Sequence, residues 1–211
     1  LVAIYAQHGS SDIPTAAYAP TQARGYGVVG TSEGVIITTS DVVPEGKDTF
    51  VVARSDGTVA TVTSIVRDSL TPYVFLRTVA DHLSAAKFAT SLPTASGTPV
   101  RLLRSGAPRA VSELWSATLV DSASLVVQNS NDWLESTESY QRLVTVSPAP
   151  PKGWSGAAVL DDQDNVLGIW SEAQGGAVPI VTIAAHVASL GQADTLSRFD
   201  IGLHTIDLSL N

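Results

Sequence analysis

Short apolar runs, many of them alternating with polar residues, recur along the whole chain and are separated by Gly, Pro, Asp and Ser. A period of two is typical of half-buried β-strands, and the turn residues indicate chain reversals. The pattern predicts twelve short strands, at Val2–Gln7, Gly34–Thr39, Thr49–Arg54, Thr58–Val66, Tyr73–Val79, Pro99–Arg104, Leu114–Val120, Leu125–Gln128, Arg142–Val146, Ala157–Leu160, Val166–Ser171 and Ala177–Val181. Only Thr182–Leu190 has apolar residues at helical spacing, followed by Gly191 as a helix stop. An all-β barrel or sandwich is therefore predicted.

Two polar segments indicate tight turns between strands. Ser55-Asp56-Gly57-Thr58 predicts a hairpin with a primed turn, because Asp-Gly tolerates the positive φ values that such a turn needs. Asp161-Asp162-Gln163-Asp164-Asn165 looks superficially like a calcium loop. It lacks the glycine and the distant glutamate of an EF-hand, so we predict a polar hairpin turn and no metal or cofactor.

Two loops are expected to matter for the organisation of the fold. The Pro- and Ser-rich stretch Ser147–Lys152 leads directly into Gly153, so we interpret it as a loop that presents a site. A second loop, Leu83–Gly97, would connect two halves of the chain.

Composition limits the classes of partner. The 211 residues suffice for one large β-domain or two small barrels, and a hydrophobic content of 44% with only 15% charged residues indicates a compact globular protein. A net charge of −8 disfavours nucleic acid and anionic lipid surfaces. The chain has no cysteine, which excludes disulfides and thiolate chemistry, and no apolar run long enough to span a membrane.

Gly153-Trp154-Ser155-Gly156 is a Gly-x-Ser-Gly segment, the kind of turn that presents a nucleophilic serine in acyl-transfer sites. Alone it is a weak signal in a chain with 16 glycines. Ala157 breaks the nucleophile-elbow pattern of α/β-hydrolases.

Several blocks in a fixed order resemble the HtrA/Deg family of trypsin-like serine proteases. They are Gly25–Val29, Glu33–Val43, Ser55–Gly57, Ile65–Asp68, Leu70–Arg77, Gly97–Leu103, Pro151–Leu160 and Val166–Ile169. The resemblance implies two packed six-stranded β-barrels within residues 1–197, the first over about 1–85 and the second over about 95–185, with a short helix at 182–190. Residues 198–211 resemble the entry to a PDZ domain.

The same resemblance assigns the site. It places Ser155 at the nucleophile, Asp41 at the catalytic histidine and Pro72 at the catalytic aspartate, with Gly153, Trp154 and Ser155 as the remnant of an oxyanion hole. An aspartate with an ordinary pKa near 3.9 is a poor base at neutral pH and, once ionised, has no proton for the leaving amine. The ring of Trp154 would either fill the cleft or anchor a ligand, and we favour filling.

We therefore expect a catalytically inactive trypsin-like domain, a pseudoprotease, that serves as an adaptor, scaffold or regulatory partner and binds a protein or peptide. An active HtrA paralogue is one candidate partner. The alternatives are an active serine endopeptidase in which Ser155 uses a non-standard base, and a purely structural oligomerisation domain, because relatives commonly form trimers. The histidines are scattered singly and none aligns with a catalytic position: His8, His82, His186 and His204. The resemblance also implies an extracytoplasmic location, in a bacterial periplasm or cell envelope.

Overall fold

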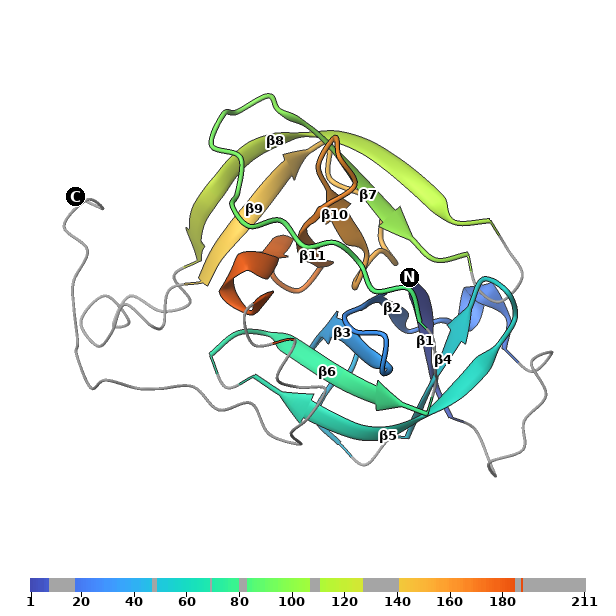
Figure 1. The fold of residues 1–211 in the computed structure, drawn as a ribbon. Helices are drawn as coiled ribbons and strands as arrows, with labels where there is room; N and C mark the ends of the chain where they lie inside the picture. Colours follow the sequence, from blue (N-terminus) through green and yellow to red (C-terminus); the bar gives the residue numbers. More distant parts are fainter. Residues whose placement is uncertain are drawn as a thin grey trace, which may run out of the picture.

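The structure is a computed structural model that describes residues 1–7, 18–46, 49–68, 70–79, 83–106, 111–126, 141–184 and 187. Within these ranges it contains twelve β-strands and two short 3-10 helices (Figure 1). The strands are β1 (Val2–Ala6), β2 (Gly25–Val29), β3 (Val35–Thr39), β4 (Phe50–Arg54), β5 (Val59–Arg67), β6 (Tyr73–Thr78), β7 (Pro99–Arg104), β8 (Glu113–Val126), β9 (Gln141–Ser147), β10 (Ala158–Leu160), β11 (Val166–Ser171) and β12 (Gly176–Pro179). The 3-10 helices are η2 (Pro20–Gln22) and η5 (Ile180–Thr182).

The strands close into two antiparallel barrels of six strands each. The first barrel has the order β1-β2-β3-β6-β5-β4 and the second the order β10-β11-β12-β9-β8-β7. Figure 1 shows the two barrels stacked against each other, with the green connection that leads to β7 crossing in front of the second barrel. The expected all-β architecture of two packed barrels is confirmed.

The barrels are joined by a continuous apolar interface, which explains why several strands are buried on both faces. In β3 the side chain of Ile36 belongs to the core of the first barrel, whereas Val35 and Ile37 belong to a cluster shared with residues of β10, β11 and β12. Tyr73 crosses this interface and donates its hydroxyl to the carbonyl of Val178 at 2.6 Å. Burial raises the pKa of the Tyr73 phenol well above its usual value, so this donor stays protonated.

Two of the strand predictions were wrong. Gly25–Val29 was not among the predicted strands, yet it forms β2. A Cβ on Gly25 would lie 2.6 Å from the side chain of Val42, so close packing requires the glycine there. Leu125–Gln128 was predicted as a separate strand, but β8 runs on to Val126; register shifts between Leu119 and Ser124 carry the chain through its polar interruption.

The remaining local predictions were confirmed in part. The hairpin at residues 55–58 forms, with Gly57 N donating to Arg54 O at 3.0 Å. Of Asp56 and Gly57 only Gly57 has a positive φ (89°), so the turn is not a primed one. The predicted helix at 182–190 lies mostly outside the described residues; of those described, Ala184 and Val187 are helical. The described residues include no helix long and apolar enough to span a membrane.

Candidate active site

The turn that carries Ser155 lies between β9 and β10 and is bound to both barrels. Gly153 and Gly156 have φ values of 86° and 84°, a conformation that favours glycine. Tyr26 of β2 donates its backbone N–H to Ser155 O at 2.9 Å, and Gly156 N donates to Trp170 O of β11 at 2.8 Å. The serine is therefore fixed where the two barrels meet.

Asp41 approaches the serine from the first barrel. It follows β3 in a short turn whose next two residues, Val42 and Val43, are fully buried. Ser155 Oγ donates a hydrogen bond to Asp41 Oδ2 at 2.5 Å, although the two residues are 114 positions apart in the sequence. The other oxygen, Oδ1, is buried and has no hydrogen-bond partner in the described part of the chain. The structure thus brings two of the three predicted triad positions into contact.

Pro72 is connected to the segment that carries Asp41 through its backbone. Its carbonyl accepts the N–H of Ser40, the neighbour of Asp41, at 2.8 Å. A proline ring has neither a hydrogen-bond donor nor an acceptor, so it cannot orient an imidazole or offset a developing positive charge. The role of a third catalytic group is not filled from this position.

Trp154 is buried in the second barrel and does not project into solvent. The residue is 4% exposed and belongs to the core cluster of that barrel. The guanidinium of Arg104 lies over its ring at 4.7 Å, and the ring of Trp115 meets it edge-on at a centroid distance of 6.3 Å. The indole therefore fills space inside the second barrel, so it does not offer an exposed anchor for a ligand.

Two residues that the sequence did not single out hold the peptide bond between Gly153 and Trp154. Arg104 Nη1 donates to Gly153 O at 3.0 Å, and Glu172 Oε1 accepts the Trp154 N–H at 2.7 Å. Opposite ends of one peptide group are thus bound by a cation and an anion. No sequence signal marks either residue, since both act on backbone atoms that every residue carries.

Glu172 also reaches the serine through its own backbone. Its N–H lies 3.1 Å from Asp41 Oδ2 and 3.2 Å from Ser155 Oγ, so it is shared between the two oxygens. The hydroxyl of Ser155 consequently donates to a carboxylate and accepts from a backbone amide.

A pocket of about 250 Å³ lies beside this turn, between Tyr26, Arg104, Glu113 and Gly153. At the edge of the pocket, Arg104 Nη2 forms an ion pair with Glu113 at 2.7 Å. Burial raises the pKa of Tyr26, the nearby Arg104 acts in the opposite direction, and the net effect is upward. The phenol is therefore a neutral donor at physiological pH.

The histidines considered as a substitute base are not placed by the structure. All four histidines, His8, His82, His186 and His204, lie outside the described residues. Within the described part of the chain, the side chain that contacts the Ser155 hydroxyl is a carboxylate.

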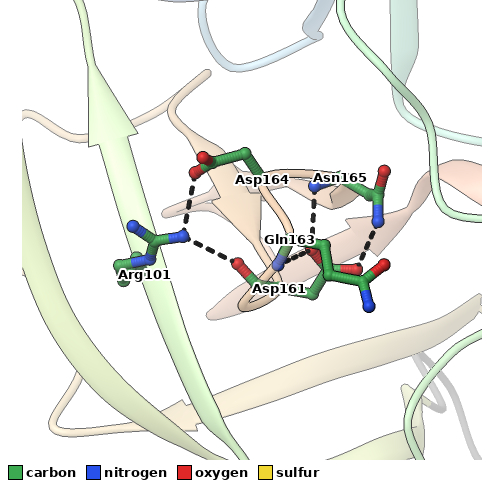
Figure 2. A network of polar contacts seen from close by, with 5 residues as sticks. All are labelled: Arg101, Asp161, Gln163, Asp164 and Asn165. Carbon is green, nitrogen blue, oxygen red and sulfur yellow. Dashed lines mark hydrogen bonds and ion pairs between the residues drawn. The ribbon is translucent and has the colours of Figure 1, made fainter.

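The acidic segment at residues 161–165 forms the predicted polar hairpin turn between β10 and β11 (Figure 2). Asp161 Oδ1 accepts the N–H groups of Gln163 and Asn165 at 2.9 and 2.8 Å. Arg101 pairs with Asp164 Oδ1 at 2.8 Å. The carboxylate of Asp161 is thus used within the turn, and the described residues include no cluster of metal-ligating side chains.

Comparisons with known proteins agree with this architecture. Residues 25–169 match the trypsin-like peptidase domain family. No curated protein sequence matches the chain significantly. Among solved structures, Deg5 is similar with a TM-score of 0.63 and 16% identity, over 80% of this chain and 84% of that one. The HtrA-type protease AlgW, solved with a decapeptide, has a TM-score of 0.63 and 20% identity, over 83% of this chain and 54% of that one.

An inactive form of the Rv3671c protein from M. tuberculosis, a serine-to-alanine mutant, has a TM-score of 0.59 and 18% identity, over 80% of this chain and 81% of that one. At such identities the structural likeness concerns the fold. Together with the family match over most of its length, the double barrel shows that this chain belongs to the trypsin-like peptidase domain family.

Proposed function

We propose that this chain is a catalytically inactive trypsin-like domain that acts as an adaptor, scaffold or regulatory partner by binding a protein or peptide. The observation that carries the proposal is the hydrogen bond from Ser155 Oγ to Asp41 Oδ2. In this arrangement a carboxylate stands where acyl transfer uses an imidazole, and Pro72 supplies no group to support it.

The chemical argument concerns the proton of the serine. Acyl transfer needs one group that accepts this proton and then returns it to the leaving amine, which an imidazole with a pKa near 6.5 can do. A carboxylate with a pKa near 3.9 is a weaker base by about 2.6 pKa units, equivalent to roughly 3.5 kcal/mol. Removal of the serine proton is therefore less favourable, and the protonated carboxyl that would pass it to the leaving amine is scarcely populated at neutral pH. Loss of triad groups typically lowers the rate by several orders of magnitude.

One observation favours a second candidate, an active serine endopeptidase with Asp41 as its base. The distance of 2.5 Å between Ser155 Oγ and Asp41 Oδ2 is within the reach of a nucleophile and its general base. In this case Asp41 would take the serine proton directly, without a third residue.

A fluorophosphonate probe separates the two candidates, because it reacts only with an activated serine. We expect the wild-type chain to show no more labelling than Ser155→Ala, while trypsin treated in parallel is labelled fully. Labelling of Ser155 that disappears in Asp41→Asn would instead establish the endopeptidase. The Asn variant keeps the size of the side chain and an oxygen acceptor for the serine hydroxyl but removes the base.

The binding role needs a separate measurement. The net charge of −8 favours peptides that are neutral or basic over acidic ones. Binding of fluorescent peptides that differ only in charge, measured by polarisation at two salt concentrations, tests this preference. A domain that binds none of them at millimolar concentration has no peptide-binding role of this kind.

A further inference from the structure

The turn between β11 and β12 lies across the candidate site. It follows Ser171 and returns at Gly176, with Gly175 at a φ of 67°. Glu172 N, at the start of this turn, donates to both Asp41 Oδ2 and Ser155 Oγ, and the Glu172 carboxylate accepts the Trp154 N–H. Glu172 therefore contacts Asp41, Trp154 and the serine hydroxyl itself.

These contacts leave the serine inaccessible. Ser155 is 8% exposed, and both its donor and an acceptor lone pair are used within the chain. The Trp154 N–H, which would otherwise be free to bind a carbonyl oxygen, is also occupied. A ligand that approaches the serine meets a site whose polar groups are already satisfied.

Within the described residues, few other contacts hold this turn in place. Glu172, Ala173 and Gly175 are exposed and Gln174 is half-buried, so the turn inserts no side chain into either core. Apart from its own turn bonds, Gly175 N to Glu172 O at 3.2 Å and Gln174 N to Ser171 Oγ at 3.3 Å, it is tied to the body of the fold through Glu172. Local opening of such a segment costs far less than unfolding.

We propose that Glu172 is an autoinhibitory latch, which closes the site around Ser155 by binding Trp154, Ser155 and Asp41, and which must be released before a peptide can bind there. The inference rests on the proposed peptide-binding function. Release frees the Trp154 N–H, the Glu172 N–H and one acceptor lone pair of Ser155 Oγ together, and the two N–H groups are suited to the carbonyl oxygens of an extended peptide.

The absence of cysteine from the chain makes the latch directly measurable. In a Ser155→Cys background, the rate of reaction with a small maleimide reports access to position 155 without any peptide or hydrolysis. Because a charge next to a thiol changes its pKa, the rate is measured across a pH series and compared at the plateau where the thiol is fully ionised.

Removing Glu172 should open the site. We expect Glu172→Ala to raise the plateau rate by about fivefold or more, the effect of losing one hydrogen bond to a charged acceptor at an exposed position. Glu172→Gln keeps an oxygen acceptor and should give a smaller increase. Glu45→Ala removes the same charge from an exposed turn elsewhere and should leave the rate unchanged.

Equal plateau rates for Glu172→Ala and Glu45→Ala would overturn the latch. Hydrogen exchange of the Trp154 amide supplies a second measurement that needs no cysteine: it should be slow in the wild-type chain and faster in Glu172→Ala or Glu172→Gln. Exchange that is equally fast in the wild-type chain contradicts the proposal. Neither measurement depends on catalysis, so their failure would refute the latch and leave the inactive function standing. Fluorophosphonate labelling of Ser155 that appears only in Glu172→Ala would instead refute the inactive function and leave the latch standing.

Discussion

Replacing Gly156 by alanine tests how tightly the serine turn is fixed to the first barrel. A Cβ at this position would lie 1.8 Å from the carbonyl oxygen of Tyr26 and 2.6 Å from its carbonyl carbon. The obstacle is the backbone of a central strand, which cannot rotate away as a side chain can. To reach even 3.0 Å, the turn and β2 would have to separate by about 1.2 Å.

This displacement determines how far Gly156→Ala lowers the free energy of unfolding. Tyr26 N now donates to Ser155 O at 2.9 Å, and a separation of this size would break the bond. A left-handed alanine costs about 1–2 kcal/mol, and the lost buried hydrogen bond with local overpacking adds about 2–3 kcal/mol. We therefore expect Gly156→Ala to lower the free energy of unfolding by about 3–5 kcal/mol, a large part of the stability of a typical domain.

Gly97 provides a matched control for the cost of placing an alanine in the left-handed conformation. Its φ is also 84°, but no atom lies within 4 Å of a Cβ built there, so Gly97→Ala should cost only about 1–2 kcal/mol. Urea denaturation followed by circular dichroism measures both variants. If the two substitutions lower the free energy of unfolding equally, the contact between Gly156 and β2 adds no cost. The idea that the serine turn joins the two barrels would then be wrong.

Two further predictions concern charge at the site and in the hairpin of the second barrel. The double variant Asp41→His, Pro72→Asp restores the imidazole and the carboxylate of a relay, so we expect fluorophosphonate labelling of Ser155 above the wild-type level; a folded double variant that stays unlabelled would show that more than the relay is missing. Burial opposes ionisation of Asp161, but hydrogen bonds within its hairpin outweigh this and hold its pKa below the usual value. Such a group stabilises the fold above its unfolded pKa and loses this contribution as the pH falls through the folded pKa, so Asp161→Ala should lower the free energy of unfolding more at about pH 6 than at about pH 2. A difference that is the same at both pH values would contradict this reasoning.

Hydrophobic alternation predicted the strands whose two faces differ, and it failed where burial comes from distant segments. β5 alternates between exposed and half-buried residues, as a strand with one covered face should. β2 is buried throughout, and Gly25 is needed there because Val42 and the carbonyl of Ser155 approach its backbone. Close approach by a residue 130 positions away leaves no periodic trace in the local sequence.

The site was predictable only as far as side-chain types identify it. Asp41 and Ser155 were placed together by family resemblance, and the structure brings them into contact. Arg104 and Glu172 were missed, since they bind the backbone atoms Gly153 O and Trp154 N from 49 and 18 positions away. A backbone donor or acceptor is present at nearly every residue, so such contacts carry no sequence signature.

The Gly-x-Ser-Gly turn has a structural role that does not involve catalysis. Gly156 is required by its contact with the backbone of Tyr26, and Ser155 O accepts a hydrogen bond from that strand. Both features join the barrels, and neither uses the serine hydroxyl. A domain that has lost its proton relay would therefore still need this turn in order to fold. The diagnostic group is instead the partner of the hydroxyl, here a carboxylate, and the function of the domain depends on what that pair does.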